Sequence, residues 1–136
     1  MKRRYVEAFM DMAERFGQTS YAERLKVGAM VVNQGHIVAQ GVNGQAPGWP
    51  TEICESIFNT TLPTVRHAEI AAFDKLKGHE YLALSADMYV SHAPCLECSK
   101  KIVDFGVKKV YYRHTYRKAD GIDHLLQNGV EVEQVD

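Results

Sequence analysis

The amino-acid sequence predicts an α/β fold of three layers, in which helices cover both faces of a mixed five-stranded sheet. Hydrophobic residues make up 46% of the 136 residues, which is enough to build a core. From residue 67 onward helical and strand patterns alternate. Alternation of this kind favours right-handed crossovers between parallel strands. The length matches one ordinary domain, so we expect residues 1–136 to form a single unit.

The first half of the chain is expected to hold one helix and a hairpin. Residues 3–16 show helical periodicity and Gly17 is a plausible stop. The side chains expected on the buried face of this helix are Tyr5, Phe9, Met12, Ala13 and Phe16. Residues 27–32 and 37–42 indicate two strands, joined by the turn residues 33–35. Residues 43–64 form a long connection rich in Gly, Pro and Thr, and such loops are usually functional or mobile.

The second half is expected to alternate helices and strands. A helix begins near His67 and ends at Gly78, and a strand follows over residues 88–91. Another helix opens at the Pro94-Cys95 step and closes at Gly106. The remaining expected elements are a strand at 107–112, a helix at 121–127 and a strand at 130–135. The two helix starts, near residues 67 and 95, would bring chemically reactive side chains together if they meet in space.

Composition limits the classes of partner. The chain has 16 basic and 17 acidic residues and a formal net charge of -1, which gives no general attraction to nucleic acid or to anionic membranes. No apolar run is long enough to span a bilayer, and no signal peptide is found. Three cysteines, two of them in C-x-x-C, argue against a disulfide framework. We therefore expect a cytoplasmic protein, in the host cytoplasm if the chain is viral.

Two short motifs carry the chemistry, His67-Ala68-Glu69 and Pro94-Cys95-Leu96-Glu97-Cys98. Cys95 and Cys98 are three residues apart, so on a helix they share one face and can bind one ion. Imidazole and thiolate ligands favour zinc over magnesium or calcium. With His67 they make three protein ligands, which leaves the fourth tetrahedral position for water, as in catalytic sites. We expect one zinc ion per chain.

Glu69 has a different expected role. Side chains at positions i and i+2 of a helix diverge, so Glu69 cannot easily join His67 as a ligand. It can face the open position and transfer protons as a general acid and base. The cysteines have two other interpretations. A thioredoxin-like redox pair would not need the upstream H-x-E motif, and a structural zinc site would need a fourth ligand, for which His92 and Cys54 are the nearby candidates.

H-x-E followed by P-C-x-x-C is the signature of zinc deaminases, and the chain resembles the cytidine and deoxycytidylate deaminase superfamily over nearly its whole length. It is most similar to the deoxycytidylate (dCMP) deaminases of phages and bacteria. Nucleoside cytidine deaminases carry a cysteine where His67 stands, so they are disfavoured. Besides the two motifs, the segments that carry the likeness are residues 24–29, 41–48, 88–90, 110–116 and 126–132.

The resemblance implies zinc-dependent hydrolysis of dCMP to dUMP and ammonia, which feeds thymidylate synthesis. It implies that Asn43 binds the sugar 3′-hydroxyl, that the Ala68 N–H binds the pyrimidine carbonyl, and that Tyr116 helps to hold the phosphate. A phosphate also needs cationic donors, and Arg24 is the first candidate. The basic residues ranked behind Arg24 are Lys26, Arg66, Arg113 and Arg117.

Relatives are often hexamers that dCTP activates and dTTP inhibits, so the resemblance implies a homohexamer and possible nucleotide effectors. The chain departs from the family in two places. Val42 replaces the aromatic residue of G-Y-N-G, and Cys54 alone remains of a second, structural zinc set. Three alternatives stay open: a deaminase of tRNA or single-stranded DNA, which should carry a basic groove with aromatics, a deaminase of guanine or another free base, and a non-catalytic zinc module.

Overall fold

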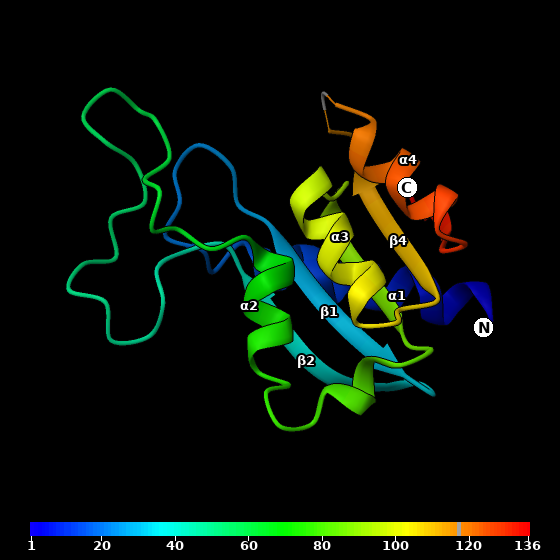
Figure 1. Ribbon diagram of the computed structural model, residues 1–136. Helices are drawn as coiled ribbons and strands as arrows, with labels where there is room; N and C mark the ends of the chain where they lie inside the picture. The colour runs from blue at the N-terminus through cyan, green and yellow to red at the C-terminus, as the bar shows by residue number, and fades with distance from the viewer. Residues whose placement is uncertain (117) are drawn as a thin grey trace.

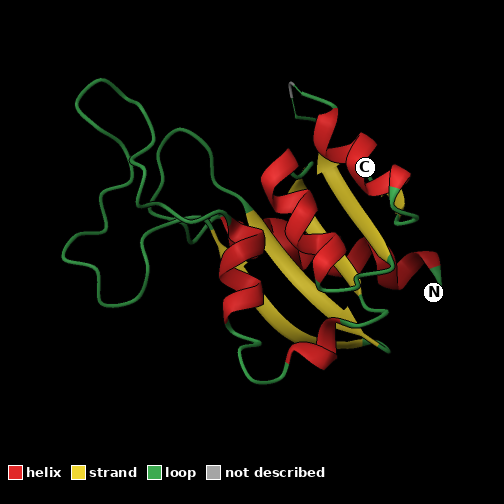
Figure 2. Ribbon diagram, viewed as in Figure 1, coloured by secondary structure: helices red, strands yellow, loops and turns green. Residues whose placement is uncertain are grey.

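The computed structural model describes residues 1–116 and 118–136, and these residues form a mixed five-stranded sheet between two layers of helices (Figures 1 and 2). The strand order is β2-β1-β3-β4-β5. The strands are β1 (Gly28–Asn33), β2 (His36–Val42), β3 (Asp87–His92), β4 (Lys109–His114) and β5 (Glu131–Gln134). β1 runs antiparallel to β2 and β3, whereas β3, β4 and β5 are parallel. The predicted fold class is confirmed.

Four α-helices cover the sheet: α1 (Arg3–Gly17), α2 (Ala68–Asp74), α3 (Leu96–Asp104) and α4 (Asp120–Gln127). Residues alternate between two cores along each strand, as the period of two in a strand requires. Met30 and Val32 of β1 pack with α1, whereas Ala29 and Val31 belong to the core under α2, α3 and α4. In Figure 1 the helices α2 and α3 lie in front of the sheet and α1 lies behind it.

The predicted elements are all present, with boundaries shifted by a few residues. A short 3-10 helix, η1 (Glu80–Ala83), was not predicted. None of the helices that the structure describes combines the length and the apolar character that a membrane crossing needs.

The predicted buried face of α1 is partly wrong. Tyr5 and Met12 are 46% and 45% exposed, and the helix instead buries Val6, Met10, Ala13 and Gly17. The reason is a close approach between α1 and β1. A Cβ atom on Gly28 would lie 2.0 Å from the carbonyl oxygen of Ala13, so α1 must turn its small residues Ala13 and Gly17 toward the strand, and Met10 and Val6 follow on the same helical face. Aromatic spacing along the sequence does not reveal so short a distance between two elements.

Another close approach sets the position of α2. A Cβ atom on Gly41 of β2 would lie 2.5 Å from the carbonyl oxygen of Ala68 and 2.5 Å from the amide nitrogen of Ala72. The first turn of α2 therefore rests directly on the backbone of β2. This contact fixes the start of α2, where His67 and Glu69 lie, relative to the sheet.

Gly41→Ala is expected to lower the free energy of unfolding by at least about 1–3 kcal/mol, because the new methyl group overlaps backbone atoms that cannot move independently. Gly44→Ala is the matched control, since a Cβ atom at Gly44 meets nothing within 4 Å. It should change the stability by less than about 0.5 kcal/mol. Urea unfolding of both variants measures the difference, and equal stabilities would contradict this packing.

The long connection between β2 and α2 extends away from the sheet as a looped arm (Figures 1 and 2). Two isolated bridges order it, Gly44 with Arg66 and Glu55 with Thr61. The side chains of Ile57 and Phe58 in this arm are 95% and 83% exposed. The base of the arm returns to the domain beside the segment that carries Arg24, because the carboxylate of Glu55 accepts the backbone N–H groups of Glu23 and Arg24 at 3.1 and 3.3 Å.

Candidate active site

His67, Cys95 and Cys98 meet where two helices begin. His67 is the N-cap of α2 and Cys95 the N-cap of α3, with Cys98 in the first turn of α3. The Nδ1 atom of His67 lies 3.5 Å from the Sγ atom of Cys95 and 3.2 Å from that of Cys98. The ligand atoms of the three residues all lie within 4.8 Å of one another. The convergence of the two helix starts is confirmed.

The spacing of these three side chains suits zinc. Zinc–nitrogen and zinc–sulfur bonds of about 2.0 and 2.3 Å in a tetrahedron separate N and S by about 3.5 Å, close to the two distances found here. Among the described residues, this group has three members, and neither His92 nor Cys54 joins it. A closed structural site with four protein ligands is therefore not formed, and one position is left for a small molecule.

The three side chains of this group shift one another's pKa values. A hydrogen bond from Cys98, with a smaller contribution from His67, lowers the pKa of Cys95 to about 4. The same bond to Cys95, together with burial, raises the pKa of Cys98. The hydrogen bond to Cys95 also raises the pKa of His67. Metal ligands must be deprotonated, so metal binding at this group releases protons and strengthens as pH rises.

Glu69 lies beside the group but is not one of its members. It occupies the first turn of α2 and is 4% exposed. Burial is the main cause that raises its pKa to about 7. A carboxyl group with this pKa can both accept and donate a proton near neutral pH, as the proton-transfer role predicted for Glu69 requires.

A cavity of about 460 Å³ connects these groups with the predicted substrate residues. Its volume falls within the usual range for sites that bind small molecules. His67, Glu69 and Cys95 form one part of the wall, and Cys98 is buried behind it. The four residues predicted to bind substrate also line the cavity: Arg24, Asn43, Ala68 and Tyr116. Segments that are far apart in the sequence thus line the same cavity.

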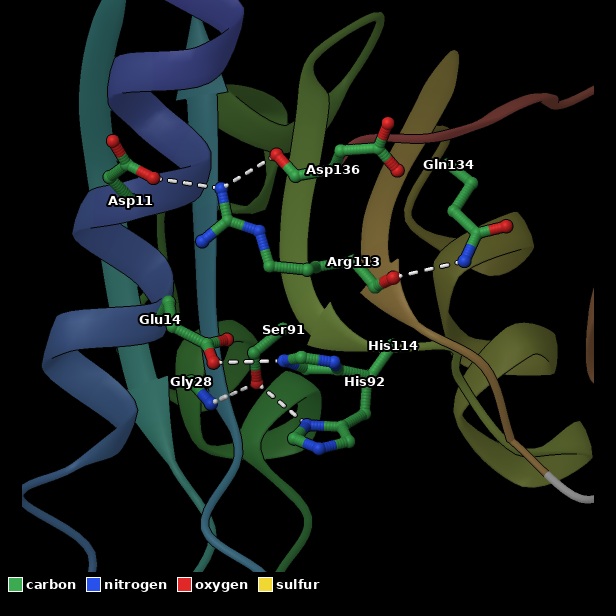
Figure 3. A network of polar contacts seen from close by, with 9 residues as sticks. All are labelled: Asp11, Glu14, Gly28, Ser91, His92, Arg113, His114, Gln134 and Asp136. Carbon is green, nitrogen blue, oxygen red and sulfur yellow. Dashed lines mark hydrogen bonds and ion pairs between the residues drawn. The ribbon is translucent and has the colours of Figure 1, made fainter.

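The other basic candidates point to different partners. The Lys26 ammonium donates to the backbone oxygen of Ser20 at 2.6 Å, and Arg66 pairs with Asp74 at 2.5 Å. Arg113 donates to Asp11 at 2.7 Å and to a backbone oxygen of Asp136 (Figure 3). Arg117 lies outside the described residues. Within the described part of the chain, Arg24 is the one lysine or arginine that lines the cavity.

The side chain of Asn43 supports the segment that carries Arg24. Its Oδ1 accepts the backbone N–H of Val27 at 2.8 Å, and its Nδ2 donates to the carbonyl of Leu25 at 2.7 Å. An asparagine amide keeps one acceptor site and one N–H after two such bonds. Contact with a sugar hydroxyl stays a prediction, and the observed role of Asn43 is to fix residues 25–27.

Sequence reasoning missed several lining residues. Cys54, which the sequence suggested only as a candidate zinc ligand, is buried and borders the cavity with Glu55. Thr115 and His92 also line it. The signal for His92 was its place at the end of a predicted strand, since ligands bind beyond the carboxyl ends of strands in α/β sheets.

The sequence matches the cytidine and deoxycytidylate deaminase zinc-binding region over residues 3–114. This span contains His67, Glu69, Cys95 and Cys98. The chain belongs to this deaminase family. The zinc cofactor predicted from the motifs is confirmed by the family, and the resemblance noted from the sequence is confirmed with it.

Solved structures similar to this deaminase include the dCMP deaminase of cyanophage S-TIM5. Its complex with dCMP and dUMP is 47% identical, with a TM-score of 0.95, and the match covers 99% of each chain. The apo form is 45% identical, with a TM-score of 0.88, and the match covers 99% of this chain and all of that one.

Among characterised sequences, ComE operon protein 2 of Bacillus subtilis is 34% identical over 94% of this deaminase and 69% of its own length. Human deoxycytidylate deaminase is 34% identical over 79% of this chain, which spans 64% of the human protein.

Proposed function

We propose that this deaminase converts dCMP and water to dUMP and ammonia. The observation that carries the proposal is the single cavity that joins the zinc-ligand group, the buried carboxyl of Glu69 and the guanidinium-bearing residue Arg24. The similarity to the cyanophage enzyme crystallised with dCMP and dUMP supports it. A panel of cytidine, deoxycytidine, CMP, dCMP, dCTP, guanine and single-stranded DNA, followed by ammonia release, tests it directly.

The roles of the residues follow from their chemistry. When bound, zinc lowers the pKa of its water to about 7 and so supplies a nucleophile at neutral pH. Glu69 would accept one proton from the attacking water and deliver it to the ring nitrogen, then accept the second proton of the same oxygen, which becomes the product carbonyl, and deliver it to the leaving amine. The N–H of Ala68 lies in the first turn of α2, where helix amides have no partner within the helix, and no backbone group of the described residues accepts it, which leaves it for the pyrimidine carbonyl.

The preference for a mononucleotide rests on charge. A phosphate monoester carries about -1.5 to -2 at neutral pH and needs charge-assisted donors. Arg24 reaches the cavity from the segment fixed by Asn43 and Glu55, and its Nη1 donates to the hydroxyl of Thr61 at 3.3 Å. A deaminase of tRNA or single-stranded DNA needs a basic track instead. The net charge of -1 does not favour a deaminase that binds such a polynucleotide.

Arg24→Ala is expected to reduce kcat/KM for dCMP by about 10- to 100-fold, the effect of losing a hydrogen bond to a charged group. Its activity on deoxycytidine, which has no phosphate, should change little. Tyr116→Phe should also reduce the activity on dCMP more than the activity on deoxycytidine, but by a smaller factor than Arg24→Ala. Arg4→Ala, an exposed arginine on α1, is the control. If wild-type enzyme deaminates deoxycytidine as well as dCMP, or an oligonucleotide faster than either, the proposal is wrong.

We also propose that the protein forms a closed homo-oligomer, a hexamer. Exposed apolar side chains on the arm, Ile53, Ile57 and Phe58, support self-association, because a soluble monomer seldom exposes such a group. Sedimentation velocity with the wild-type protein measures the mass. An active monomer would contradict the proposal. Activation by dCTP and inhibition by dTTP stay predictions from the resemblance, and the same assays with added nucleotide test them.

A further inference from the structure

His92 is a cavity residue to which the zinc chemistry gives no role. It ends β3, three residues before Cys95, and it lines the same cavity as Arg24 and Glu69. It is not among the described residues whose ligand atoms converge with His67, Cys95 and Cys98. A half-buried imidazole in the wall of a substrate cavity has a hydrogen-bonding edge that can face the substrate.

The neighbouring Ser91 determines which nitrogen of His92 carries the proton. The buried Oγ of Ser91 accepts the backbone N–H of Gly28 at 3.0 Å and lies 2.9 Å from Nδ1 of His92 (Figure 3). A buried hydroxyl hydrogen needs an acceptor, because an unsatisfied one costs stability. Nδ1 is the acceptor that the described part of the chain offers to it. The ring proton of neutral His92 is therefore on Nε2.

A second histidine supports the ring from its face. The rings of His92 and His114 lie 4.7 Å apart at 39°, in the register that pairs β3 with β4. His114 Nε2 lies 2.9 Å from a carboxylate oxygen of Glu14 on α1 (Figure 3). Burial, and to a smaller extent the nearby His114, lowers the pKa of His92. With Nδ1 engaged by Ser91, the Nε2 edge is the one left for the cavity, and protonation of the ring would keep that donor.

The described wall of the cavity offers a phosphate little positive charge. One described cationic side chain, Arg24, lines it, together with the carboxylates of Glu55 and Glu69. A phosphate monoester that carries close to two negative charges needs several N–H or O–H groups. Thr115 and Tyr116 follow β4 and line the cavity beside the end of β3. His92 belongs to this edge of the sheet and adds an N–H to the two hydroxyl groups.

We propose that His92 is a specificity-determining residue that donates its Nε2–H to an oxygen of the substrate's 5′-phosphate, with Ser91 fixing the tautomer. This inference rests on the proposed function, because it assumes a nucleoside monophosphate substrate. It adds a neutral donor to the charged contact expected from Arg24. If His92 only filled space, its replacement would lower the activity on deoxycytidine and on dCMP by the same factor.

The test compares His92→Phe, which keeps a ring but has no donor, with His92→Gln, whose amide can replace the Nε2 donor. His92→Phe is expected to lower kcat/KM for dCMP by about 10- to 100-fold, the effect of one hydrogen bond to a charged group. Its activity on deoxycytidine should stay within about threefold of wild type, and His92→Gln should recover most of the dCMP activity. The exposed His79→Phe is the matched control. Equal losses with both substrates, or no loss with either, overturn the proposal.

Nitrogen-15 spectra of the imidazole rings give a readout that does not depend on turnover or on the folding of a variant. We expect the Nε2–H tautomer for His92 in the wild-type enzyme. Its Nε2 resonance should shift when the product dUMP is added but not when deoxyuridine is added. An Nδ1–H tautomer, or an equal response to both compounds, overturns the proposal.

The kinetic data also separate this inference from the proposed function. If wild-type enzyme shows no preference for dCMP over deoxycytidine, both fail. If wild type prefers dCMP and His92→Phe keeps the full preference, only the role of His92 fails.

Discussion

Glu69→Gln is expected to lower kcat for dCMP by about 10²–10⁴-fold, the usual contribution of a positioned proton-transfer group. The amide has the shape of the carboxyl group but cannot accept the proton of the attacking water. Glu69 is buried beside the ligand group without joining it. The variant should therefore keep its zinc and its fold. Initial rates of ammonia release, with zinc content and circular dichroism on the same samples, measure the three quantities.

Glu97→Gln is the matched control for this experiment. Glu97 is an exposed carboxylate in the first turn of α3, between the two cysteines. The Glu97→Gln variant should retain near wild-type activity, because the side chain of Glu97 does not line the cavity. If Glu69→Gln loses zinc together with its activity, Glu69 is a ligand and the proton-transfer role is wrong.

The Cys95→Ser/Cys98→Ser double variant is expected to contain no zinc and to have no measurable activity. Removal of both thiolates leaves His67 as the one remaining member of the ligand group. A single imidazole cannot hold the ion, and binding at zinc sites with several protein ligands is worth about 10–16 kcal/mol in small peptides at neutral pH. Metal analysis of wild-type enzyme should give one zinc per chain, and thermal unfolding should show a lower midpoint for the variant.

Cys54→Ser provides the comparison for the loss of a thiol. Cys54 is buried, but its sulfur is not part of the described ligand group. This variant should keep one zinc per chain. A wild-type ratio near two, or full zinc content in the Cys95→Ser/Cys98→Ser variant, would show that the metal is bound elsewhere.

The zinc-ligand group could be predicted because its determinants are local. Cys95 and Cys98 are one helical turn apart, and the Pro94-Cys95 step marks the start of that helix. His67 and Glu69 likewise open α2 together. The chemistry of imidazole, thiolate and carboxylate then limits the metal and the reaction. Hydrophobic periodicity also placed the strands and helices, because each element must turn its apolar side chains toward a core.

The residues that surround the substrate depended on contacts between distant segments. Cys54 gave no sign in the sequence that it borders the cavity, and Asn43 gave none that its amide fixes residues 25–27. Arg66 and Arg113 resembled Arg24 as cations, yet they pair with carboxylates elsewhere. Which charges converge is decided by the packing of separate elements.

The sequence by itself was enough to predict the class of fold, the expected zinc ligands and the carboxylate expected to transfer protons, because periodicity within each element and residue chemistry within two short motifs carry these predictions. Tertiary structure alone decided the strand order, the buried face of α1 and the wall of the cavity. Gly28 and Gly41 show why, since a Cβ atom at either position would overlap backbone atoms of a helix that packs against the strand. Such distances arise from the simultaneous packing of several elements, and periodicity in any one segment does not encode them.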